Sequence, residues 1–210
     1  MKKQLFAALV ILTSYAAIAQ ETPKTNESKL EFSATGKLGF ARLKQTGNVP
    51  LNGNLTGSDV LLSYQISPKC DISTGLGLYE FNANTTINGA NASLKNSYLH
   101  IPVQFSGDFG LFKNVKPENQ TVFFTLGIGL YANTLLKQKL ETPTGNNEEK
   151  NMGWNFGISS QIGAKFLLTD VLKIGIGIES QSDLTKMEKD GVKQKIEQYN
   201  GMYFKLGFKF

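Results

Sequence analysis

A chain of 210 residues is long enough for one domain, and its single cysteine, Cys70, excludes an internal disulfide. Charged residues make up 19% of the chain, which is below the proportion of about a quarter that is usual for soluble domains. The formal charge of +5 falls to +3 without Lys2 and Lys3, because 20 basic residues then stand against 17 acidic ones. Arg42 is the only arginine and no basic cluster occurs, which excludes nucleic acid as a partner.

The first residues have the three parts of a secretory signal peptide. Two lysines precede an apolar run at 5–12, and an Ala-x-Ala site ends at Ala19. This run is shorter than the roughly 20 residues of a membrane-spanning helix, so an N-terminal anchor is the less favoured alternative. We therefore predict a cleaved signal peptide at 1–19, a flexible polar leader at 20–29 and a single domain at 30–210.

From residue 30 onward, apolar and non-apolar residues alternate with the period of a β-strand. The alternating segments are 30–40, 59–66, 72–79, 97–105, 122–131, 154–166, 173–180 and 202–210. Their connections are long and polar at one end of the implied sheet, and shrink to tight turns at 67–69 and 168–170 at the other. The connection 107–119 is long where a short turn is expected, and the polar stretch 183–198 is interpreted as a loop.

The stretch KIGIGIES at 173–180 places isoleucine on one face and glycine on the other. Glycine has no side chain to pack in a strand, so this face must need space. A soluble sandwich or lipocalin-type barrel would expose charges on its solvated face, whereas Gly, Ser, Thr, Gln and Asn predominate here. That composition suits the cramped interior of a small barrel, where glycines accommodate large tyrosines and lysines pair with glutamates.

The apolar face of each segment is then expected to meet lipid. A tilted strand of about ten residues crosses a bilayer, closure pairs every backbone group, and long loops at one end only are typical of outer-membrane barrels. We therefore predict an all-β fold, a single closed antiparallel up-and-down transmembrane β-barrel of about eight strands. Aromatic girdles are expected at both interfaces. The residues expected toward the long loops are Trp154, Phe40 and Tyr64, and those expected toward the short turns are Phe32, Phe105, Phe166 and Phe208.

Two stretches resemble known outer-membrane proteins. The final strand, GMYFKLGFKF, resembles the C-terminal signal read by the barrel-assembly machinery, with Phe204, Phe208 and Phe210 on one face. The block SYLHIPVQF at 97–105, with the Gly-x-Gly strand that follows it, resembles the small outer-membrane β-barrel family of the PorT type. The resemblance covers 30–210. The chain departs from the family at His100, where an acidic residue is usual, so no role of that acid is carried over.

The resemblance implies a location in the bacterial outer membrane and contact with outer-membrane lipid. It also implies the barrel-assembly machinery as a partner during biogenesis, and proteins of secretion or surface assembly as candidate partners. It leaves the oligomeric state open.

Few residues suggest chemistry. His100 is the only histidine, which excludes multi-histidine metal sites and makes a Ser-His-Asp triad depend on one residue. The Gly-x-Gly stretches lack the helix that follows in a nucleotide site. We therefore predict no catalytic, cofactor-binding or metal-binding residue. The residues predicted to line the lumen are His100, Tyr98, Lys165, Glu179 and Lys205.

These features favour a non-enzymatic integral outer-membrane barrel with a structural or binding role at the cell surface, assisting secretion or surface assembly. Three alternatives stay open: a narrow channel for ions or small solutes, a membrane-embedded lipid- or peptide-processing enzyme that uses His100, and a secreted soluble carrier of the lipocalin type. Recording in planar bilayers tests the channel, the variant His100→Ala tests the enzyme, and membrane fractionation tests the soluble carrier.

Overall fold

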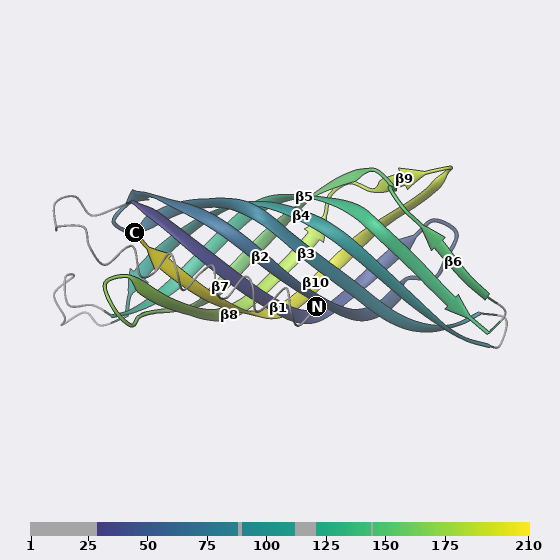
Figure 1. Cartoon of the computed structure of the whole chain (residues 1–210), viewed down its shortest axis with the longest axis horizontal. Coiled ribbons are helices and arrows are strands. Elements are labelled where there is room, and N and C mark those ends of the chain that lie inside the picture. Colours follow the sequence, from purple (N-terminus) through teal and green to yellow (C-terminus); the bar gives the residue numbers. More distant parts are fainter. Residues whose placement is uncertain (1–28, 88–89, 112–120, 144) are drawn as a thin grey trace.

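The computed structural model describes residues 29–87, 90–111, 121–143 and 145–210, and its main feature is an antiparallel sheet closed on itself (Figure 1). The strands of the ring are β1 (Leu30–Gln45), β2 (Leu51–Ser67), β3 (Cys70–Ile87), β4 (Ala90–Gly110), β5 (Val122–Thr142), β7 (Trp154–Leu167), β8 (Leu172–Asp183) and β10 (Val192–Lys209). Each strand pairs with the next, and β10 pairs back onto β1. The predicted closed up-and-down barrel of eight strands is confirmed.

Several predictions concern residues outside these ranges. The predicted signal peptide at 1–19, nearly all of the predicted leader at 20–29 and most of the connection 107–119 lie outside the described residues. Within them, no helix is long and apolar enough to cross a membrane.

The register of the ring sets the tilt of the strands. The path of paired residues from Leu30 in β1 returns to β1 at Phe40, ten residues farther along. It passes through Tyr64, Ile72, Phe105, Ile128, Ser160, Ser180 and Asn200. With roughly 3.3 Å per residue and roughly 4.8 Å between strands, this stagger over eight strands corresponds to a tilt of about 40°. Outer-membrane barrels have strand tilts in this range.

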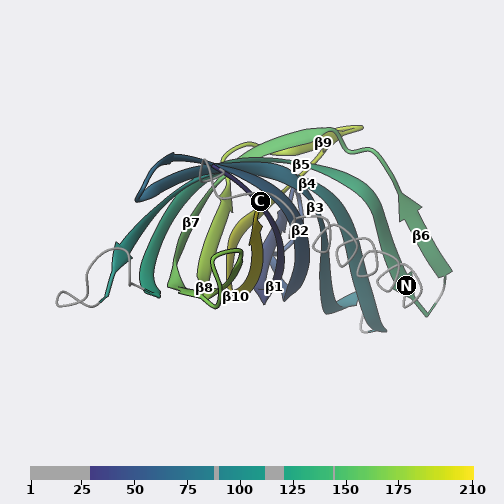
Figure 2. The ribbon, with the colours of Figure 1, turned by 60° about the vertical axis from the view of Figure 1, so that its left-hand side comes forward.

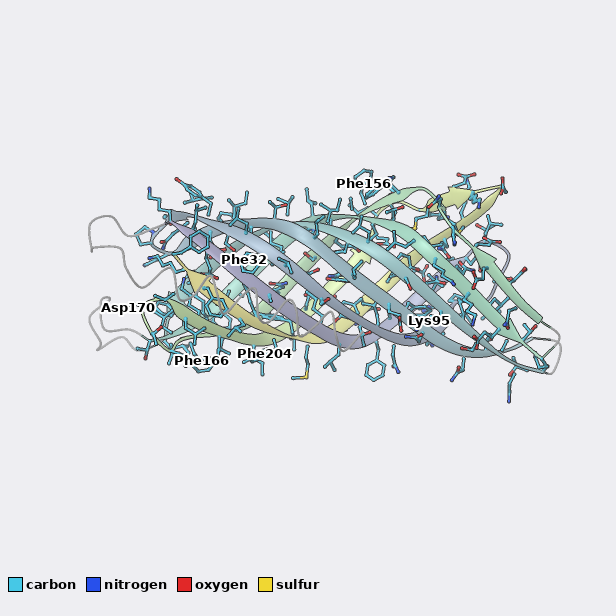
Figure 3. The ribbon with its side chains drawn as sticks, in the orientation of Figure 1. Phe32, Lys95, Phe156, Phe166, Asp170 and Phe204 are labelled. Carbon is cyan, nitrogen blue, oxygen red and sulfur yellow. The ribbon has the colours of Figure 1, made fainter. Side chains whose placement is uncertain are left out.

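The outer surface nearer the short turns is apolar. Side chains predicted to face lipid are well exposed, including Leu38 (62%), Ile128 (68%) and Ile178 (59%). Figure 3 shows Phe32, Phe166 and Phe204 on the outside toward the end with the turn at Asp170, whereas Phe156 lies farther along the barrel. We call this outward apolar surface the lipid belt. Its side chains point away from the interior, as the alternation predicts.

One girdle residue is at the opposite end from the one expected. Tyr64 pairs with Leu30 and Ile72, beside the short turn at 68–69, so its expected place near the long loops is wrong. Tyr64 lies there because β2 runs from the long-loop end toward the short turn, so the last residues of β2 lie at the short-turn end.

The strands continue well beyond the lipid belt, and the long connections at that end are mostly paired backbone. We call this extension the crown; its described residues are 41–55, 80–87, 90–97, 134–143, 145–153 and 184–198. Here the polarity of the two faces reverses, with Arg42 and Lys44 exposed outside while Leu43 is buried inside. In Figure 3, Lys95 lies on the outside of this part. The reversal follows from the surroundings, because the exterior meets water here and the interior is an apolar core.

Two short strands complete the crown. β6 (Gly145–Glu149) pairs with β5, and β9 (Met187–Lys189) pairs with β10. The interpretation of 183–198 as a loop is therefore wrong, since β9 and the first part of β10 lie within it.

Interior tyrosines lie against glycines of neighbouring strands. A Cβ at Gly157 would overlap the ring of Tyr131, and one at Gly57 would overlap Tyr79. Tyr98 is accommodated differently, because the Nδ2 of Asn96 donates a hydrogen bond to its hydroxyl at 2.8 Å. The glycine face therefore provides space for aromatic rings in the interior.

Replacing Gly157 with valine is expected to destabilise the barrel by about 1–3 kcal/mol, because the added side chain overlaps Tyr131 in a packed interior. Gly36→Val is the matched control: Gly36 faces outward with open space around it, and valine favours strands. Urea unfolding of both variants, followed by gel mobility of the unboiled protein, measures the difference. Equal losses would contradict the packing described here.

Candidate functional site

The described part of the barrel interior has three layers along the length of the barrel. A charged layer lies at the short-turn end, a hydrogen-bonded polar layer lies in the middle, and an apolar layer lies in the crown. Each layer is built from inward-facing positions of the alternating strands.

The middle layer is centred on Lys37 of β1. Its Nζ lies 2.9 Å from Oδ2 of Asp59 and 2.8 Å from Oε2 of Glu179, and donates a hydrogen bond to the hydroxyl of Tyr79 at 2.7 Å. The Lys37 side chain is 1% exposed and both carboxylate side chains are fully buried. Gln181 donates a further hydrogen bond to Glu179 at 2.6 Å. This cluster ties β1, β2, β3 and β8 together across the interior.

His100 lies beside this cluster, also in the middle layer. Its Nδ1 is 2.6 Å from Oδ1 of Asn133, and its ring stacks on Tyr79 with centroids 4.2 Å apart. On its other side lies Tyr131, whose hydroxyl donates to Asp183 at 2.8 Å. His100 is 1% exposed. His100 is thus packed against two tyrosine rings and has almost no exposed surface.

The charged layer faces the short-turn end. Lys165 pairs with Asp108, which also accepts a hydrogen bond from Thr125 at 2.9 Å. Lys173 pairs with Glu31 at 2.5 Å. Lys205 lines the same shallow cavity as these groups. Three acidic side chains and three lysines line this cavity, so the layer has no strong excess of either charge.

The apolar layer closes the interior at the crown. Its buried members include Leu43, Leu55, Phe81, Leu94, Leu135, Met152, Met187, Ile196 and Tyr199. Met152 lies in the segment that follows β6 and Met187 is the first residue of β9, and both side chains are essentially buried. Both side chains thus add to the apolar core inside the crown.

The five residues predicted to line the lumen do not form one site. Glu179 and His100 lie in the middle layer and Tyr98 in the apolar layer, while Lys165 and Lys205 lie at the short-turn end. Sequence reasoning did not predict that Lys37 forms ion pairs with both Asp59 and Glu179. The available signal was that charged residues of three different strands occupy inward positions. Among the described residues, no three His, Cys, Asp or Glu side chains gather as a metal site.

Comparisons with known proteins identify the fold. No family model matches the chain, and no curated protein matches it in sequence. The structure of Neisserial surface protein A is similar over 89% of this chain and 100% of that chain, with 13% identity and a TM-score of 0.53. The outer-membrane protein OprG from Pseudomonas aeruginosa is similar over 90% of this chain and 99% of that chain, with 11% identity and a TM-score of 0.51.

The chain therefore has the fold of the small outer-membrane β-barrels. The lipid belt adds a second, independent observation, because isoleucine, leucine and phenylalanine cover the outside of the ring while the charged groups are paired inside. Together they describe an integral membrane barrel of the outer-membrane type.

Proposed function

We propose that this protein is a non-enzymatic barrel of the bacterial outer membrane, with a closed lumen and a crown that serves as its binding surface at the cell surface. The observation that carries the proposal is the interior: the Lys37 cluster fills its middle and an apolar core caps it. A barrel closed in this way offers no path through itself, so the surface available for function is the crown that extends beyond the lipid belt.

The alternatives fit the interior less well. A channel needs a continuous polar path, which the core of the crown interrupts. An enzyme using His100 needs access to a side chain that is 1% exposed. A lipocalin-type carrier holds its ligand in an apolar interior, whereas the apolar residues of this ring are mostly outside. Current steps in single-channel recordings of the reconstituted protein would favour the channel.

The role of the crown is proposed to be assistance in secretion or surface assembly, alongside partner proteins. The resemblance of 97–105 and the following strand to the PorT type supports this finer assignment. Phe204, Phe208 and Phe210 are proposed to guide the chain to the barrel-assembly machinery during biogenesis. Phe204 on β10 and Phe210 directly after it are exposed, so such a signal is accessible there.

The orientation of the crown gives a direct test. An epitope tag inserted in the crown turn at 46–50 is expected to be labelled by antibody on intact cells, because the long hairpins of outer-membrane barrels face outward. The matched control is the same tag in the turn at 68–69, which is expected to be labelled only after the outer membrane is permeabilised. The opposite pattern would place the crown in the periplasm and overturn the proposal.

A further inference from the structure

The ring of strands is closed at the lipid belt and open in the crown. Along the belt, β7 and β8 pair with each other between β5 and β10. Beyond it, β6 takes the place beside β5 and β9 the place beside β10. β6 and β9 have no pairing with each other in the described part of the chain, and Figures 1 and 2 both show them diverging. The crown is therefore a curved sheet with two edges.

The edge at β6 is accessible along its whole length. All five residues of β6 are exposed, and only its β5 side is paired. In an antiparallel pair, alternate residues direct their N–H and C=O groups away from the partner strand, so β6 presents free backbone donors and acceptors to solvent. An edge of this kind is a template for an added strand.

The segment that follows β6 fixes this edge in place. Asn151 donates its backbone N–H to the carbonyl of Leu135 at 3.3 Å, and Met152 is buried in the apolar core. Lys189 of β9 donates from Nζ to the carbonyl of Lys150 at 2.9 Å. β6 is thus held at its base by contacts to both sides of the opening, which makes its edge a defined surface.

β6 carries two acidic side chains and no basic one, so its free edge favours a basic partner, although Lys137 and Lys139 lie beside it on β5. Glu148 and Glu149 are consecutive residues of β6, so their side chains lie on opposite faces of the sheet, and Glu188 lies on β9. Glu148 pairs with Lys137 at 2.7 Å and Glu188 pairs with Lys193 at 3.1 Å, but all four side chains are substantially exposed, and such pairs are readily exchanged. Glu149 makes no ion pair among the described residues. Pairing of β6 with β6 of a second copy would bring acidic edges together, which is unfavourable.

We propose that the free edge of β6 binds an extended, lysine- or arginine-bearing segment of a partner protein as an added β-strand. The inference rests on the proposed function of the crown as the binding surface, and names the kind of partner that the surface fits. Backbone hydrogen bonds to β6 supply the attachment, and Glu148 on one face of the sheet and Glu149 on the other select for basic side chains.

The test uses full-length protein in lipid vesicles and three synthetic peptides. The first alternates lysine with valine, the second has glutamate in place of lysine, and the third is the lysine peptide interrupted by prolines. At a concentration of about ten times its dissociation constant, the lysine peptide is expected to slow amide hydrogen exchange within 145–149 roughly tenfold. Only the lysine peptide is expected to do so, since proline removes the strand's donors and glutamate is repelled.

Two proline variants locate the binding at the edge. Asn146→Pro and Asn147→Pro remove N–H groups that point to opposite sides of β6, so one of them spares the pairing with β5. Amide hydrogen exchange at 138–142, the part of β5 that pairs with β6, shows which of the two variants keeps this pairing. That variant is expected to lose the protection by the lysine peptide while the gel mobility of the barrel stays unchanged. Glu148→Gln with Glu149→Gln is expected to weaken binding severalfold at low salt, whereas Glu141→Gln, an exposed carboxylate on β5, is the matched control.

Three results would overturn the inference. The first is no protection by the lysine peptide in protein whose crown tag is labelled on intact cells; the proposed function would then stand without this partner. The second is protection that persists in the proline variant that spares β5. The third is protection that depends on protein concentration without peptide, which would assign the edge to a second copy. A crown tag that is not labelled would count against both proposals.

Discussion

Lys37→Met is expected to lower the free energy of unfolding of the barrel by about 3–5 kcal/mol, because removing one partner of a buried ion pair leaves uncompensated charge in the interior. Here one ammonium serves two fully buried carboxylates, Asp59 and Glu179, and also donates to the hydroxyl of Tyr79. Methionine retains most of the length of the side chain and removes the charge and the donors. Urea unfolding in lipid vesicles, followed by the fluorescence of Trp154 and by gel mobility, measures the loss.

Two further variants separate burial from charge. Lys205→Met removes a lysine at the partly exposed short-turn mouth and is expected to cost about 0–1 kcal/mol. The triple variant Lys37→Met, Asp59→Asn and Glu179→Gln leaves no unpaired charge, so it is expected to regain most of the loss. A Lys37→Met protein as stable as the parent would mean that water reaches both carboxylates, and would argue against a closed lumen.

The sequence was sufficient to predict the faces of the strands in the lipid belt. Leu38 and Ile128 are exposed and Glu179 is buried, as the period-two pattern requires. Within the belt the surroundings are uniform, with lipid outside and packed side chains inside, so one rule assigns each residue. The same rule predicted that glycines would make room for tyrosines, as Gly157 does for Tyr131.

The crown could not be predicted by that rule, because its surroundings are reversed. At 41–45 the charged residues face outward and Leu43 faces inward, so the alternation continues with the opposite sign. The abundance of Asn, Gly, Ser and Thr there is also typical of loops, which made paired strands resemble connections. A rule that searches for period two regardless of which face is apolar would have extended these strands.

The middle layer could not be assembled from one sequence for a different reason. Lys37 and Glu179 are separated by 142 positions, and they meet only because β1 and β8 lie on either side of β10 in the closed ring. Register and shear decide which inward charges share a level, and both depend on the pairing of all eight strands. The sequence indicates that these charges face inward, and the closed ring determines their partners.

Ile178→Arg is expected to destabilise the protein by about 2–4 kcal/mol, the cost of a cationic side chain on the lipid face near the bilayer midplane. Ile178 is 59% exposed and lies between Ile162 and Met202 on the lipid belt. Glu179 cannot neutralise the new charge, because successive side chains of a strand point to opposite faces. Unfolding in lipid vesicles measures the loss.

Asn54→Arg is the matched control, since Asn54 also faces outward but lies in the crown between Phe40 and Asn82. Its arginine remains in water and is expected to change stability by less than about 0.5 kcal/mol. The comparison depends on where lipid ends, since both substitutions place the same charge on the same outer face. Equal losses at the two positions would extend the lipid belt over the crown. No loss at Ile178 would leave the belt in water, and would restore the soluble carrier that the apolar exterior argues against.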